Sequence, residues 1–145
     1  MDALGLDATT QQKIDLLFKE QKGIVAFSGG PDSIYLVLAL FKYFPFFKFD
    51  LVYFNHHLRP QKELYTEINI IQAFAKRNHL NLRIKSIPVQ NLALKHKLSV
   101  EHAARILRYR WLHHLSHLRG AKIVLTGHHF NDSLETFFLK LANGV

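Results

Sequence analysis

Apolar residues follow two different patterns that alternate along the chain. Runs of consecutive apolar residues are typical of strands buried on both faces of a sheet, and apolar residues every three or four positions are typical of helices. The predicted strands cover residues 23–27, 49–54, 82–87 and 121–126. The predicted helices cover residues 10–21, 32–44, 62–78, 99–118 and a last segment from 132 to about 143.

This alternation predicts an α/β fold: a doubly wound parallel sheet with helices on both faces. At 145 residues the chain is long enough for one buried core, so we expect residues 1–145 to form one domain. No strand is predicted after the last helix to complete the sheet. We therefore expect a fragment or a domain that is incomplete at its C-terminus.

Polar loops follow three of the predicted strands, at residues 28–33, 55–60 and 127–131. In doubly wound sheets, ligands bind beyond the carboxyl ends of the strands, near the point where the strand order reverses. The three loops should therefore face one crevice.

The first of these loops predicts a phosphate site. Its sequence is Ser28-Gly29-Gly30-Pro31-Asp32-Ser33, and it joins a buried strand to a helix. The two glycines let ligand oxygens approach the backbone N–H groups, and the helix dipole favours negative charge. Asp32 alone would repel phosphate, so its carboxylate indicates Mg²⁺ bound between the two. No lysine follows the glycines, which distinguishes this loop from a Walker loop; the alternative is a tight turn without a ligand.

The loop after the last predicted strand carries a second cluster of polar residues. His128 or His129 can contact phosphate or accept a proton, and Asp132 can share the metal with Asp32. The alternative is that Asp132 and Glu135 only cap the following helix.

Three arginines lie on the predicted helix 99–118. Guanidinium groups match phosphate geometry, and Arg105, which is nearest to the start of the helix, is best placed to reach the crevice. For Arg108 and Arg110 a solvated basic face is an equally good interpretation.

The composition of the chain limits which partners, metal sites and cofactors it can have. Nineteen Lys and Arg against eleven Asp and Glu give a formal net charge of +8, which fits a polyanionic partner or a basic solvated surface. The sequence contains no cysteine, which excludes disulfides, thiolate zinc sites and iron–sulfur clusters and suits a cytoplasmic protein. The longest aromatic run is too short to cross a bilayer, so we expect no membrane contact.

Four motifs occur in a fixed order. They are the loop 28–33, Asn55-His56-His57-Leu58-Arg59, Ala104-Arg105-x-x-Arg108-Tyr109-x-x-Leu112 and His128-His129-x-Asn131-Asp132-x-x-Glu135-Thr136. Together they resemble the tRNA(Ile)-lysidine synthetases of the N-type ATP pyrophosphatase, or PP-loop, superfamily. The first motif is also found in GMP synthetases, NAD synthetases and tRNA thiolases, whereas the other three are more specific.

The resemblance implies an adenine nucleotide alpha hydrolase-like fold that uses ATP and Mg²⁺. It implies an ATP-dependent ligase that adenylates C2 of the wobble cytidine in tRNA(Ile) with a CAU anticodon. L-lysine then displaces AMP, and the codon read changes from AUG to AUA. A homodimer is compatible with this family, whose C-terminal tRNA-binding domains lie beyond the segment matched here.

The resemblance also implies roles for individual residues. Asp32 and Asp132 would bind Mg²⁺, Arg105 would contact phosphate, and His128 or, in our preferred assignment, His129 would lie at the reaction centre. The pyrophosphate of ATP would be bound by Ser28, Gly29, Gly30, Pro31, Asp32 and Ser33.

Two other functions remain open at this stage. A related tRNA 2-thiolase is disfavoured because sulfur transfer needs thiols or a cluster, and the sequence has no cysteine. A non-catalytic ATP-binding module would not need two carboxylates converging on one metal.

Overall fold

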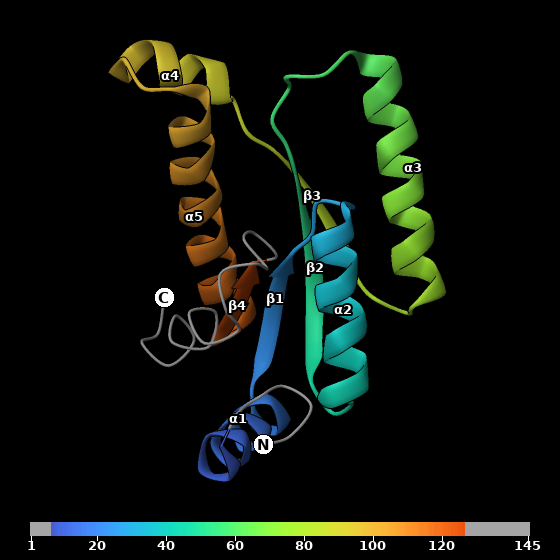
Figure 1. Ribbon diagram of the computed structural model, residues 1–145. Coiled ribbons are helices and arrows are strands. Elements are labelled where there is room, and N and C mark those ends of the chain that lie inside the picture. The colour runs from blue at the N-terminus through green and yellow to red at the C-terminus, as the bar shows by residue number, and fades with distance from the viewer. Residues whose placement is uncertain (1–6, 127–145) are drawn as a thin grey trace.

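A four-stranded parallel sheet organises residues 7–126, the part of the chain that the computed structural model describes (Figure 1). Its strands are β1 (Lys22–Ala26), β2 (Lys48–Asn55), β3 (Leu82–Ser86) and β4 (Ile123–Thr126). The strand order is β3-β2-β1-β4, and every neighbouring pair is parallel. The chain therefore winds outward from β1 to β3 and then returns to the other side of β1. This confirms the predicted doubly wound topology, with its reversal between β1 and β4.

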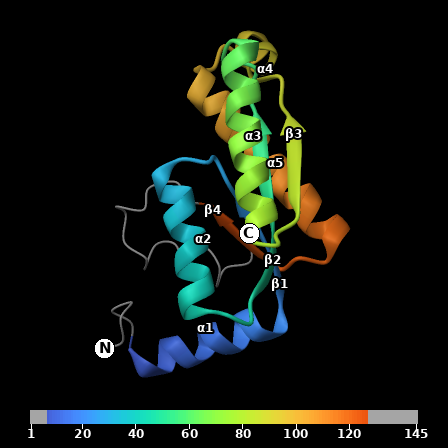
Figure 2. The ribbon, with the colours of Figure 1, turned by 90° about the vertical axis from the view of Figure 1, so that its right-hand side faces the viewer.

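Helices cover both faces of this sheet, as predicted. The helices are α1 (Ala8–Glu20), α2 (Pro31–Tyr43), α3 (Gln61–Arg77), α4 (Val89–His96) and α5 (Val100–Arg119). Figures 1 and 2 show α2 and α3 on one face and α4 and α5 on the other, with α1 below the amino ends of the strands.

The buried strand residues divide between two clusters, one on each face. Val25 and Leu51 pack with residues of α1, α2 and α3, whereas their neighbours Ile24 and Val52 pack with residues of α4 and α5. Successive side chains of a strand point to opposite faces, so a sheet covered on both sides needs unbroken apolar runs. The apolar runs in the sequence have this cause.

Capping residues define the ends of α1 and α5; α1 begins at Ala8, two residues before the predicted start at residue 10. The Asp7 carboxylate accepts a hydrogen bond from the Thr10 N–H at 2.9 Å and starts α1. The Ser99 hydroxyl accepts one from the His102 N–H at 3.2 Å and starts α5, and Gly120, with φ of 62°, ends it. Such caps satisfy N–H and C=O groups that have no partner inside the helix.

Helix α4 was not predicted; the sequence pattern indicated a loop there. The helix has only eight residues, it buries only Val89 and Ala93, and its Leu94 is 81% exposed. Such a short segment carries too few apolar repeats to show a helical period. The predicted helix from residue 132 lies outside the described residues.

Within the described residues, no helix has both the length and the apolar character needed to span a membrane.

We expect Phe18→Ala to lower the free energy of unfolding by about 3–5 kcal/mol, as for other buried phenylalanines. Phe18 is 1% exposed, and its ring packs edge-on against Phe44 at 4.5 Å and stacks on Phe47 at 4.4 Å. Urea unfolding followed by circular dichroism measures the change. Phe46→Ala is the control, because Phe46 is 74% exposed and its loss should cost no more than about 0.5 kcal/mol. Equal effects of the two substitutions would contradict the role of α1 in the core.

Candidate functional site

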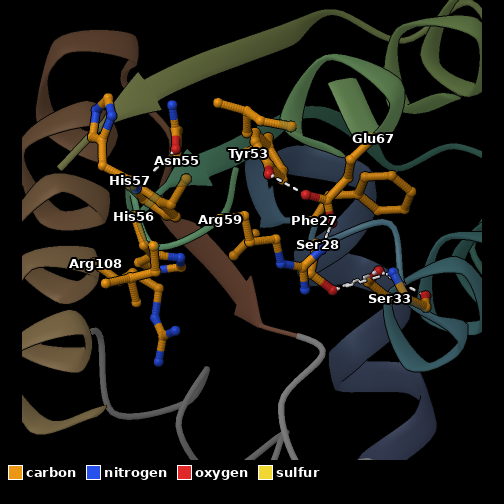
Figure 3. Close-up of a pocket in the computed structure, with 15 residues that line it drawn as sticks. Phe27, Ser28, Ser33, Tyr53, Asn55, His56, His57, Arg59, Glu67 and Arg108 are labelled. Carbon is orange, nitrogen blue, oxygen red and sulfur yellow. Dashed lines mark hydrogen bonds and ion pairs between the residues drawn. The ribbon is translucent and has the colours of Figure 1, made fainter. Parts of the chain in front are cut away.

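A cavity of about 350 Å³ opens at the carboxyl ends of β1 and β2 (Figure 3). Two of the three polar loops named above line it, those at 28–33 and 55–60, together with residues of α3 and α5. The third loop, 127–131, lies outside the described residues. The volume is within the range of small-molecule sites, and the position is the one expected for ligands of doubly wound sheets.

The turn after β1 requires glycine at its centre. Gly29 has φ of +80°, a conformation that residues with a side chain rarely adopt. A Cβ atom at this position would also lie 3.0 Å from Cγ1 of Ile71 on α3. Gly29 therefore allows the turn to pack closely against α3.

The two serines of this turn hold its shape. The Ser33 hydroxyl, which is buried, donates to the Gly30 carbonyl at 2.9 Å. The Ser28 hydroxyl accepts from the Gly30 N–H at 3.3 Å and lies 3.3 Å from the Ser33 hydroxyl. These bonds organise the loop before any ligand arrives, in addition to any contact that the hydroxyls make with a phosphate.

The start of α2 offers hydrogen-bond donors to an anion. Pro31 occupies the first turn, and no side chain caps the helix at Gly30. The Ile34 N–H makes the first bond to Gly30, at 3.1 Å, so the N–H groups of Asp32 and Ser33 precede the intrahelical ladder. A phosphate fits this helix end, because its oxygens accept from such groups and its charge suits the dipole.

Asp32 lies exposed in the first turn of α2, beside these donors rather than among the residues that line the cavity. Its carboxylate oxygens suit a hard cation such as Mg²⁺. Among residues 7–126, no three metal-binding side chains cluster. The second predicted ligand, Asp132, lies outside the described residues, as do His128, His129 and Glu135.

Asn55 shapes the loop on the opposite side of the cavity. Its side chain is 8% exposed, and Oδ1 accepts a hydrogen bond from the His57 N–H at 2.9 Å. This bond supports His57 in a left-handed conformation, with φ of 57°. The Asn55 of the sequence motif therefore has a structural role in the turn, while His56 and His57 line the cavity.

A cluster that sequence reasoning missed joins this loop to α3. The Tyr53 hydroxyl donates to Oε2 of Glu67 at 2.7 Å, and the Arg59 guanidinium pairs with Oε1 of the same carboxylate at 3.0 Å. Burial, and then the hydrogen bond to Glu67, raise the pKa of the Tyr53 hydroxyl. The residues are 14 and eight positions from Glu67 in sequence, so no local spacing indicates their contact.

On α5, the arginine that lines the cavity is Arg108 rather than Arg105. Burial lowers the pKa of the Arg108 guanidinium, and the neighbouring charge of Arg105 acts in the same direction. Arg105 is exposed, and its guanidinium lies over the Tyr109 ring at 5.6 Å. A partly buried cation favours an anionic partner, so Arg108 joins the candidates, while the role of Arg105 stays a prediction.

Comparison with known proteins agrees with this geometry. Residues 6–145 match the family model of the PP-loop domain. Curated tRNA(Ile)-lysidine synthases from Shouchella clausii, Thermosipho africanus and Borreliella afzelii are 32%, 33% and 33% identical over 97%, 92% and 96% of the chain. The chain covers 31%, 31% and 33% of those proteins, about a third of their length.

Two solved structures share the fold. An NH3-dependent NAD synthetase from Campylobacter jejuni matches with a TM-score of 0.55 and 16% identity over 82% of this chain and 56% of its own. A U34-tRNA thiolase from Methanococcus maripaludis matches with a TM-score of 0.61 and 15% identity over 94% of this chain and 50% of its own. At these identities the likeness shows the fold alone.

We expect Gly29→Ala to destabilise the protein more than Gly120→Ala, by about 1–3 kcal/mol. Both glycines have positive φ, so both substitutions carry backbone strain, but no atom lies within 4 Å of a Cβ at Gly120. The difference between their free energies of unfolding therefore isolates the contact with Ile71. Equal losses would show that the turn does not pack tightly against α3.

An alkaline titration should reveal the buried and hydrogen-bonded Tyr53 hydroxyl. Folding raises the pKa of the Tyr53 hydroxyl, so the folded state favours the protonated form. The stabilisation from this hydroxyl is complete below about pH 10, the ordinary pKa of tyrosine, and is lost as the pH rises further. Absorbance of tyrosinate should show a late step that is lost in Tyr53→Phe and kept in Tyr65→Phe, the control at an exposed position. A late step that survives Tyr53→Phe would refute the assignment.

Proposed function

The chain belongs to the PP-loop domain family, and from this premise we propose that it is the ATP-binding catalytic part of a tRNA(Ile)-lysidine synthase. The observation that carries the proposal is the glycine turn after β1, with its uncapped helix start, in a chain about a third identical to synthases of that name. Under this proposal the partners are tRNA(Ile) with a CAU anticodon and L-lysine, in the cytoplasm.

The backbone at the first β–α junction would bind the pyrophosphate of ATP. Donors already in position stabilise the charge that builds up as pyrophosphate leaves, without the cost of reorganising solvent. The N–H groups of Asp32 and Ser33 are such donors, and Gly29 allows the turn that carries them. Arg108 extends the positive lining toward α5, and we retain Arg105 as a further phosphate contact.

Asp32 and Asp132 would hold Mg²⁺, which supplies positive charge to the phosphates and orients them for in-line displacement. The adenylyl group goes to the wobble cytidine, and AMP leaves when the lysine amine forms the new carbon–nitrogen bond. That amine must lose a proton before it attacks, and we propose His129, or its neighbour His128, beside the reaction centre.

A thiolase function is less well supported, although one solved neighbour is a thiolase. That thiolase was solved with its 4Fe–4S cluster, and such clusters are held by cysteine thiolates, whereas the 145 residues here contain no cysteine.

The proposal predicts AMP formation that depends on the tRNA and on L-lysine. Asp32→Asn should lower the rate of AMP formation by about 100-fold or more, because it removes a charged ligand of the proposed metal. The melting temperature should stay unchanged, because Asp32 is exposed and lies outside the core. The assay combines Mg-ATP, a tRNA transcript with a CAU anticodon and L-lysine, with chromatographic detection of AMP. Asp15→Asn, an exposed carboxylate on α1, is the control.

Two outcomes would contradict the proposal. An unchanged rate of AMP formation in Asp32→Asn would show that Asp32 does not hold a metal ion that the reaction needs. ATP binding without AMP formation by the wild-type chain, even with tRNA and lysine present, would favour a nucleotide-binding module.

A further inference from the structure

We propose that Glu67 is a positioning residue, which fixes the Arg59 guanidinium at the cavity so that it meets the bound nucleotide. This inference rests on the proposed function, because it takes ATP as the ligand of the cavity.

Glu67 uses its two carboxylate oxygens for two different partners. Tyr53 donates to one oxygen at 2.7 Å from the end of β2, and Arg59 pairs with the other at 3.0 Å from the following loop. All three residues line the cavity, and Figure 3 shows Glu67 of α3 joined to the Tyr53 hydroxyl. One carboxylate thus ties together a strand, a loop and a helix that form one wall of the site.

The exposure of the Arg59–Glu67 ion pair indicates that its main effect is not on the stability of the fold. The Arg59 side chain is 62% exposed and that of Glu67 is 24% exposed. Ion pairs with such an exposed partner contribute little to folding. Tyr53, by contrast, is 6% exposed, so its hydrogen bond anchors the carboxylate on the buried side. The anchored carboxylate then restricts a long side chain that would otherwise sample many rotamers.

The restricted guanidinium still has donors for a ligand. The ion pair with Glu67 uses Nη1, and arginine carries five N–H donors in a planar fork that suits phosphate oxygens. Arg108 lines the same cavity from α5. A polyanionic nucleotide would therefore meet arginines that come from two separate parts of the chain.

Neutralising Glu67 distinguishes a positioning role from a simple effect of net charge, because the two explanations predict opposite changes in ATP affinity. If only net charge mattered, neutralising Glu67 would make the cavity more positive and ATP would bind more tightly. If Glu67 positions Arg59, the same change weakens binding. The amide of glutamine can accept from only one of the two partners, and its NH₂ group would face the other donor.

Calorimetric titration of Mg-ATP into the chain and its variants tests the inference. We expect Glu67→Gln and Arg59→Ala each to raise Kd about threefold to tenfold. The double variant should bind no more weakly than either single variant, since the two residues act as one unit. Glu63→Gln is the matched control: Glu63 lies one turn earlier on α3, is exposed and does not line the cavity, so its Kd should match that of the wild type.

Equal or tighter binding by Glu67→Gln overturns the inference, and so do losses that multiply in the double variant. Arg59→Ala changes an exposed loop residue with little risk to folding, so wild-type affinity in that variant overturns it as well. A melting temperature for each variant separates loss of fold from loss of affinity. If the wild-type chain itself binds no ATP, the proposed function fails. If the wild-type chain binds ATP and the variants bind it with the same affinity, only the inference about Glu67 fails.

Discussion

The parallel pairing of β1 with both β2 and β4 determines where chemistry can occur in this molecule. Ala26, at the end of β1, lies level with Val52 and with Thr126. The loops that leave β1 and β2 therefore emerge at the same end of the sheet, and backbone amides, polar side chains and the N-terminus of α2 gather there. An antiparallel partner on either side would send its polar loop to the opposite edge.

The glycine turn uses this arrangement in a specific way. It carries the chain from the sheet to α2 while packing against Ile71 of α3, so the core supports the donors at the start of α2. Its two serine hydroxyls bond within the loop. Pre-organised donors of this kind bind charge without first rearranging. An NAD synthetase and a tRNA thiolase share this fold, so the fold alone does not determine the activity.

Sequence patterns predicted what depends on local spacing. Buried strands, capped helices and the strand–glycine–helix junction all have short-range signatures, and the structure confirms the sheet and the ends of α5. The link between Glu67 and Tyr53 joins long side chains from distant positions, so no pattern predicts it. The choice between Arg105 and Arg108 depends on which face of α5 meets the sheet. The small buried residue Ala104, one turn before Arg108, marks that face and is a usable signal.

The aromatic packing of Phe18, Phe44 and Phe47 lies at the amino end of the sheet, whereas the cavity lies at the carboxyl end. The buried residues of α1, Ile14 and Phe18, therefore lie at the opposite end of the sheet from the cavity. Substitutions can therefore change stability at one end of the sheet and the lining of the cavity at the other with little interference between them.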